Sequence, residues 1–279
     1  MSDKKIKMIA LDLDGTTLRS DHTLSPRTMA AFKASMEQGV HIVVSTGRVY
    51  SALPELLFGI EGLEYVINSN GAQITELATG RRIYENYMDP DAVEQVVAIL
   101  RGTGISVETF VDGMAYADAD EFYDIKEHGS TFRDANYVLT TRNPIPNILD
   151  FMLEHKTEIE NISLNFEFTA DKDRMWPVLT AIDNMTLTSS FAHNFEMGGA
   201  TTSKAEALRF LMDRLGVTKD HLMACGDSPN DSRMIELARV GVVMGNASDH
   251  MKSQADYVTD GNNDDGVAKA IEKFVLGDA

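Results

Sequence analysis

The sequence is poor in several residue types, and each shortage excludes a class of protein. It has a single cysteine, Cys225, so no internal disulfide can form and a reducing compartment is expected. No apolar run approaches the roughly 18 residues of a membrane span. Cations are also scarce: 25 lysines and arginines stand against 43 acidic residues, and the formal net charge is −18. We therefore expect no nucleic-acid partner and no membrane partner.

The rest of the composition is typical of a folded protein with two domains. A length of 279 residues is large for one domain, and an apolar content of 43% supports a proper core. The opening Met-Ser-Asp-Lys-Lys leads directly into an apolar stretch, so we expect no signal peptide and a cytoplasmic location. No apolar helix face stands out as unmatched, and the oligomeric state stays unknown.

Residues 8–17, Met-Ile-Ala-Leu-Asp-Leu-Asp-Gly-Thr-Thr, are the stretch around which the chain is organised. A short apolar run of this kind is typical of a buried strand, and it delivers Asp12 and Asp14 at its end. Two carboxylates buried side by side are costly unless a cation or a chemical role compensates. Gly15 follows, where a backbone without a Cβ can turn sharply or approach a ligand closely.

Short apolar strands alternate with helices over residues 1–84 and again over residues 191–279. The strands expected after the first one span residues 40–44, 65–67, 221–225, 240–244 and 255–258. Alternation of this kind predicts an α/β fold with a doubly wound parallel sheet, in which ligands bind beyond the carboxyl ends of the strands. Residues 85–190 lack strands that end in acidic or glycine-rich loops, and we predict an inserted α+β domain there.

Two further groups of polar residues can converge on the acidic strand end. Asp227 follows the expected strand 221–225, and a third hard oxygen donor beside Asp12 and Asp14 favours Mg²⁺ over zinc. An acidic protein that binds an anion needs a locally cationic or N–H-rich site. Its expected members are Thr46 and Gly47 where a helix begins, the mobile charge of Lys204 and the amide of Asn230.

Taken together, these motifs resemble those of a known family. Asp12-x-Asp14-Gly-Thr, Ser45-Thr46-Gly47-Arg48, Lys204 and Gly226-Asp227-x-x-Asn230-Asp231 are similar, in order and spread, to the four motifs of haloacid dehalogenase-like (HAD) phosphatases. The long insert and the segment Asn70-Gly71-Ala72 resemble the Cof-type sugar-phosphate phosphatases, in which a Rossmann-like core carries a cap domain. The core resemblance is specific, whereas only the layout agrees for the cap.

The resemblance implies a role for each motif. Asp12 would be the nucleophile that forms an aspartyl-phosphate, and Asp14 the general acid and base. Mg²⁺ would be held by the Asp12 carboxylate, the Asp14 main-chain carbonyl and Asp227. The phosphoryl oxygens would be bound by Thr46, Gly47, Lys204 and Asn230. The expected substrate is a small phosphorylated metabolite, and sugar phosphates are the leading candidates.

Several alternatives stay open on the sequence alone. A phosphomutase would use the same intermediate but pass the phosphoryl group to a second hydroxyl, and an inactive metabolite-binding protein could keep the fold. The resemblance gives Asp231 a supporting role behind the phosphate-binding residues. Asp231 also stands where an acid closes a capping box that begins at Ser228, so we leave it out of the catalytic residues. Asn70 is expected to shape a turn, and Cys225 to be a small buried hydrophobe.

Overall fold

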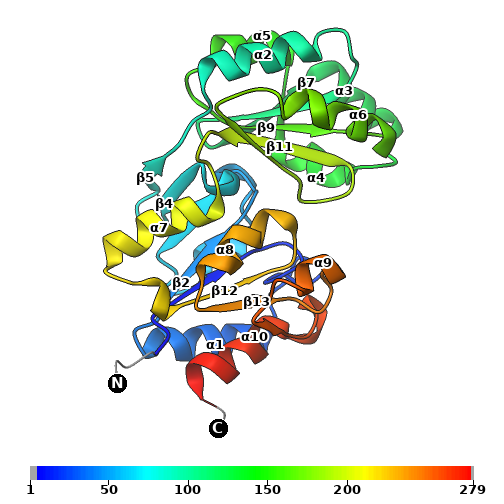
Figure 1. The fold of residues 1–279 in the computed structure, drawn as a ribbon. Coiled ribbons are helices and arrows are strands. Elements are labelled where there is room, and N and C mark those ends of the chain that lie inside the picture. Colours follow the sequence, from blue (N-terminus) through cyan, green and yellow to red (C-terminus); the bar gives the residue numbers. More distant parts are fainter. Residues whose placement is uncertain (1–4, 278–279) are drawn as a thin grey trace. The chain divides into compact units, whose positions relative to one another are not determined.

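The structure is a computed structural model that describes residues 5–277. Its chain divides into two compact units (Figure 1), the first made of Met1–Thr46, Pro54–Tyr84 and Lys204–Ala279, the second of Gly47–Leu53 and Glu85–Ser203. The opening residues 1–4, on which the expectation about a signal peptide partly rests, lie outside the described residues. Within residues 5–277, none of the helices combines the length and the apolar character needed to cross a membrane.

The first unit is built on an eight-stranded sheet in the order β14-β13-β12-β1-β2-β3-β4-β5. Its strands are β1 Met8–Leu11, β2 His41–Ser45, β3 Tyr65–Asn68, β4 Gln73–Glu76, β5 Arg81–Glu85, β12 Leu222–Gly226, β13 Val240–Val243 and β14 Tyr257–Val258. The strands from β14 to β3 are parallel, and β1 lies at the centre between β12 and β2. The predicted doubly wound α/β fold is therefore confirmed.

Helices cover both faces of this sheet, as Figure 1 shows for α1 and α10 on one side and α7 and α8 on the other. The helices of this unit are α1 Pro26–Glu37, α7 Lys204–Leu215, α8 Ser232–Leu237, α9 Asp249–Lys252 and α10 Gly266–Ile271. Ser25 caps α1 by accepting from the Thr28 N–H, and Pro26 occupies the first helical position. The α7 face buries Leu208 and Leu211 against the sheet.

One edge of this sheet departs from the prediction. Strand β4 runs antiparallel to β3, and the sequence analysis expected neither β4 nor β5. Their sequences, Gln-Ile-Thr-Glu and Arg-Arg-Ile-Tyr-Glu, are too polar to stand out as buried strands. A tight turn over Ser69–Gly71 joins β3 to β4.

The second unit has its own six-stranded sheet in the order β10-β11-β9-β6-β7-β8. The strands are β6 Ser106–Val111, β7 Met114–Asp118, β8 Arg142–Ile145, β9 Ile159–Asn165, β10 Met185–Thr188 and β11 Asn194–Gly199. All neighbours are antiparallel except β7 and β8. The helices are α2 Pro90–Leu100, α3 Ala119–His128, α4 Ala135–Thr141, α5 Ile148–Glu154 and α6 Thr169–Leu179. Strands and helices in this order form an α+β unit.

The chain returns to the first unit later than the expected residue 191. Strand β11 pairs with β9 and β10, so the second unit extends to Ser203. Gly198 and Gly199, which precede Lys204 in the sequence, therefore belong to this unit rather than to a loop of the first sheet. Gly199 closes β11 so near to other backbone that a Cβ there would collide with the Tyr87 carbonyl oxygen.

Candidate active site

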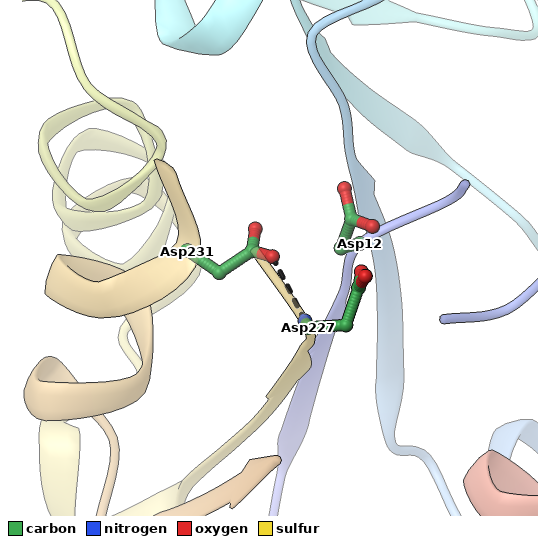
Figure 2. A group of neighbouring side chains, drawn as sticks. All are labelled: Asp12, Asp227 and Asp231. Carbon is green, nitrogen blue, oxygen red and sulfur yellow. Dashed lines mark hydrogen bonds between the residues drawn. The ribbon is translucent and has the colours of Figure 1, made fainter. Parts of the chain in front are cut away.

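Three carboxylates from separate segments of the first unit meet at the carboxyl end of its central strands (Figure 2). Asp12 follows β1, Asp227 follows the adjacent parallel strand β12, and Asp231 lies in the turn Pro229–Asp231 that precedes α8. Oxygen atoms of these three residues all lie within 4.8 Å of one another. The topology of a parallel sheet explains the meeting, because neighbouring strands end at the same edge.

Lys204 is the cation of this group. Its Nζ lies 2.6 Å from Asp12 Oδ1 and 2.7 Å from Asp231 Oδ1, and its side chain is 1% exposed. The prediction of a mobile charge at this position is wrong, because Lys204 begins the buried side of α7 and is held between two carboxylates. We call Asp12, Asp227, Asp231 and Lys204 the acidic cluster.

Asp231 does more than the capping role that the sequence indicated. Its Oδ2 accepts the backbone N–H groups of Asp227 at 3.0 Å and Ser228 at 3.1 Å, which includes the acidic arm of the predicted capping box. Its other oxygen binds Lys204. The resemblance gave Asp231 a supporting role, and its hydrogen bond to Lys204 is a contact through which it can support that residue.

Burial and crowding control the charge states of the acidic cluster. Burial and the Asp231 carboxylate raise the pKa of Asp12 well above its usual range, and Lys204 offsets only part of the rise. The same two causes raise the pKa of Asp227. Burial alone would lower the pKa of Lys204, but Asp12 and Asp231 raise it instead, so the ammonium stays charged. The raised pKa values show that ionisation of all three carboxylates is opposed while one ammonium is the only counter-charge in the acidic cluster. Full ionisation would leave two excess negative charges, which a divalent cation with a preference for oxygen would neutralise.

The loop after β1 packs against Asp227. Thr16 Oγ1 donates to Asp227 Oδ1 at 3.0 Å, and a Cβ on Gly15 would lie 2.7 Å from Asp227 Oδ2. Gly15 also has φ +78°, so a side chain there is excluded by space and by backbone conformation. The Asp14 side chain is exposed and is not among the three clustered carboxylates. Its metal contact, expected through the main-chain carbonyl, stays a prediction.

The segment after β2 differs from the prediction. Residues 46–64, all of them described, contain the 3₁₀ turns Tyr50–Ala52 and Glu55–Gly59 and no α-helix, so the expected helix start at Thr46 and Gly47 is wrong. Arg48 donates to the Ala52 carbonyl at 3.0 Å, and Pro54 follows, which limits the first turn. The boundary between the two units passes between Thr46 and Gly47, so Gly47 belongs to the second unit.

Thr46 and Asn230 are joined through a residue that the sequence analysis assigned to a turn. Thr46 is buried, and its carbonyl accepts the Asn70 N–H at 3.0 Å. Asn230 Nδ2 donates to Asn70 Oδ1 at 3.0 Å. The structure thus links two of the predicted phosphate-binding residues on the same unit that holds the acidic cluster.

The last residues of β12 support the site without reacting. Cys225 is buried, as predicted, and burial raises the pKa of its thiol to about 12, so it is not a nucleophile near neutral pH. Asp12, by contrast, combines a carboxylate at a strand end with a bound ammonium and two further acids. The Asp12 carboxylate can act as a nucleophile toward an electrophilic group, provided that a bound cation reduces the repulsion between the carboxylate and an anionic substrate.

Comparison with known proteins agrees with this chemistry. A family model described as haloacid dehalogenase-like hydrolase matches residues 9–271. The chain is 29% identical over 277 residues to the 5-amino-6-(5-phospho-D-ribitylamino)uracil phosphatase YcsE of Bacillus subtilis, with 98% of each chain covered. It is 31% identical to the phosphatase YwpJ of the same organism, over 97% of this chain and 100% of that one. A solved haloacid dehalogenase-like hydrolase from B. subtilis superposes with a TM-score of 0.82 at 29% identity, over 97% of this chain and 100% of the other.

Proposed function

Because the chain belongs to the haloacid dehalogenase-like hydrolases and is a phosphatase of the Cof type, we propose that it hydrolyses phosphate monoesters of small metabolites, sugar phosphates first, with Mg²⁺. The observation that carries the proposal is the acidic cluster. A buried carboxylate lies at the end of the central strand, against a fixed ammonium and two further acids. Phosphoryl transfer needs positioning and charge neutralisation of this kind.

In the proposed reaction, an Asp12 carboxylate oxygen attacks phosphorus and the ester P–O bond breaks, which leaves an aspartyl-phosphate. Asp14 gives a proton to the departing alkoxide and then takes one from the water that hydrolyses the intermediate. The exposure of the Asp14 side chain supports this role, since a proton shuttle must reach both the leaving group and water.

The chain's own cations and amides hold the phosphoryl oxygens in this proposal, together with one hydroxyl. Those residues are Thr46, Gly47, Lys204 and Asn230. Lys204 is fixed by Asp231, and a fixed charge loses little entropy when the substrate binds. Asp231 therefore acts as the support of Lys204 rather than as a group that touches the substrate.

The donor set fits Mg²⁺. Asp12, Asp227 and the main-chain carbonyl of Asp14 would hold it, and Asp231 is occupied by Lys204 and two backbone N–H groups. Bound there, Mg²⁺ would offset the repulsion between the Asp12 carboxylate and the phosphoryl dianion. The excess negative charge of the acidic cluster supports this assignment.

The test is phosphate release by the purified protein with Mg²⁺ and with a chelator. The substrates are p-nitrophenyl phosphate and a panel of phosphorylated metabolites. The panel begins with 5-amino-6-(5-phospho-D-ribitylamino)uracil, the substrate named for YcsE. Free phosphate supports the proposal, an isomeric sugar phosphate identifies a mutase instead, and no turnover of any substrate indicates a binding protein.

Asp12→Asn gives the sharpest check of the nucleophile. The amide is nearly isosteric but cannot attack phosphorus, so we expect turnover to fall by at least about 10⁴-fold. Asp14→Asn should slow or trap the phosphoenzyme, detectable by mass spectrometry after acid quenching, while Mg²⁺ binding largely survives. Wild-type rates in Asp12→Asn contradict the proposed nucleophile.

A further inference from the structure

Asn70 occupies a buried position between two proposed phosphate ligands. It lies in the turn Ser69–Gly71 after β3 and is 5% exposed. Its backbone N–H donates to the Thr46 carbonyl, and its side-chain Oδ1 accepts from Asn230 Nδ2, both at 3.0 Å. All three residues belong to the first unit. A residue that only shaped a turn would not need the second contact.

We propose that Asn70 is a positioning residue of the phosphate site, an inference that rests on the proposed function. By accepting one hydrogen of the Asn230 amide, Asn70 directs the NH₂ end of that amide, rather than its carbonyl, toward the phosphoryl group. Its backbone N–H at the same time fixes the peptide of Thr46. One residue thus sets the orientation of two groups that bind the same dianion, Asn230 through its side chain and Thr46 through its backbone N–H.

The hydrogen bonds that are missing point to a ligand. Asn70 Nδ2 and Asn230 Oδ1 are both buried and have no partner. Buried polar atoms without a partner are costly, and here the two atoms belong to amides that are hydrogen-bonded to each other beside the proposed phosphate ligands, where a bound ligand can complete their bonding. A phosphoryl dianion presents only acceptors, which Nδ2 can satisfy. A hydroxyl of the leaving group is the kind of donor that Oδ1 lacks.

The backbone of this turn is strained in a way that favours asparagine. Ser69, Asn70 and Gly71 have φ of 50°, 57° and 99°, so three consecutive residues lie in the left-handed region. Strain of this kind persists where the surrounding structure requires it, and it is common at functional sites. Asparagine tolerates the left-handed conformation better than most residues, and it alone combines that tolerance with an amide.

Asn70→Gly tests the inference cleanly, because glycine accepts the same backbone conformation and only the side chain is lost. We expect kcat/KM for p-nitrophenyl phosphate to fall about tenfold to 100-fold, and the inhibition constant of inorganic phosphate to rise by a similar factor. The matched control is Asn184→Gly, an exposed asparagine with φ 60° in the second unit, which should leave both values unchanged. An unchanged phosphate constant in Asn70→Gly overturns the inference.

A double-mutant cycle separates positioning from general damage. Because part of the Asn70 effect passes through Asn230, Asn70→Gly combined with Asn230→Ala should lose less than the product of the two single losses, whereas independent effects multiply. Asn70→Asp keeps the acceptor for Asn230 but replaces Nδ2 by a charged oxygen. Phosphate binding should then weaken more than in Asn70→Gly. A multiplicative cycle, or a milder effect in Asn70→Asp, contradicts the proposed geometry.

Failure of this inference is distinguishable from failure of the proposed function. A wild-type protein that releases no phosphate from any substrate removes the proposed function. A wild-type protein that is active and an Asp12→Asn variant that is inactive, beside an Asn70→Gly variant with normal kinetics, remove only the role of Asn70. Thermal unfolding of each variant shows that the comparison is made on folded protein.

Discussion

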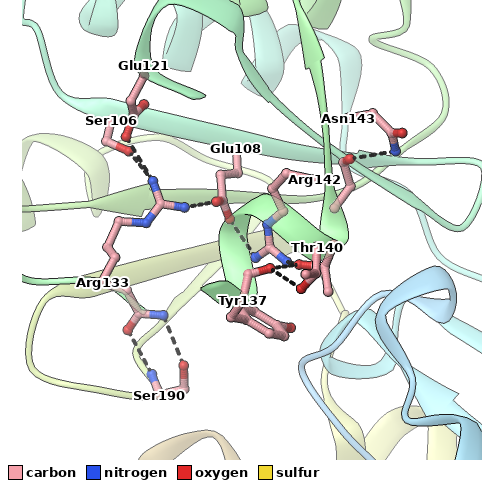
Figure 3. A network of polar contacts seen from close by, with 12 residues as sticks. Ser106, Glu108, Glu121, Arg133, Tyr137, Thr140, Arg142, Asn143 and Ser190 are labelled. Atoms are coloured by element: carbon pink, nitrogen blue, oxygen red, sulfur yellow. Dashed lines mark hydrogen bonds and ion pairs between the residues drawn. The ribbon is translucent and has the colours of Figure 1, made fainter. Parts of the chain in front are cut away.

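Each unit of this protein buries a group of charged side chains, and the two groups have opposite arrangements. In the acidic cluster, one ammonium is held between carboxylates. In the second unit, one carboxylate, Glu108, is held between the guanidinium groups of Arg133 and Arg142, and Arg133 also binds Glu121 at 2.8 Å (Figure 3). We call Glu108, Glu121, Arg133 and Arg142 the arginine cluster.

Charge balance is what separates the two groups. The arginine cluster has two cations and two anions, so its formal charges cancel. The acidic cluster has three anions and one cation, which leaves room for a divalent ion. A buried cluster whose formal charges cancel can stabilise or specify the fold by itself. A buried cluster with a net charge needs a ligand of opposite charge to neutralise it. This difference, rather than burial itself, distinguishes a candidate active site from a structural ion pair.

Removal of the ammonium should have the largest effect on this comparison. Lys204→Met leaves Asp12 and Asp231 buried without their cation, so we expect kcat/KM to fall by about 10²–10³-fold and the free energy of unfolding to drop by about 3–5 kcal/mol without Mg²⁺. Part of the lost stability should return with Mg²⁺, because the ion neutralises the same carboxylates. Chemical denaturation and phosphatase assays measure both. Lys33→Met, on the exposed face of α1, is the matched control.

Removal of the shared carboxylate should affect the arginine cluster through stability alone. Glu108→Gln leaves Arg142 buried without its carboxylate and Arg133 with Glu121 alone, and we expect a loss of about 3 kcal/mol in the free energy of unfolding. Mg²⁺ should restore none of this lost stability, since the arginine cluster without Glu108 has a net positive charge and offers no site for a further cation. Recovery with Mg²⁺ equal to that of Lys204→Met would show that the two clusters are not different in kind. Glu127→Gln on α3 provides the exposed control.

The smallest expected effect is the pH dependence of Mg²⁺ stabilisation. The pKa values of Asp12 and Asp227 are raised in the folded protein, so without the ion their contribution to stability falls as pH rises above the ordinary carboxyl range. Protons compete with Mg²⁺ for the same oxygens, and the stabilisation by Mg²⁺ should therefore be larger at about pH 8 than at about pH 5. Thermal unfolding at both values checks the sign, and a shift independent of pH contradicts it.

The sequence predicted the acidic cluster better than the arginine cluster for a topological reason. Asp12 and Asp227 directly follow short apolar strands, and in a parallel sheet the ends of neighbouring strands meet. Glu108, Arg133 and Arg142 come from β6, from the segment before α4 and from the start of β8. No local spacing relates these three positions, so only the tertiary fold reveals that they meet.

The structure also differs from the sequence-based predictions where tertiary contacts override the local conformational preference of a segment. The expected helix after Thr46 is replaced by two 3₁₀ turns, of which Tyr50–Ala52 belongs to the second unit and Glu55–Gly59 to the first. Asn70 was assigned to a turn correctly, but its contact with Asn230 joins residues 160 positions apart. Likewise, the extent of Lys204 burial depends on α7 packing against the sheet. The sequence could place Asp12 and Asp227 at neighbouring strand ends, but not the contact between Asn70 and Asn230, which depends on tertiary packing.

The short segment Gly47–Leu53 determines how relatives of this protein can be recombined. It leaves the first unit directly after Thr46 and packs Val49 and Ala52 against Phe110 and Ala115 of the second unit. A chimera that exchanges only Glu85–Ser203 would set those two side chains against foreign neighbours. Exchange of both pieces together keeps this small core intact, and two of the four junctions then fall immediately beside Thr46 and Lys204.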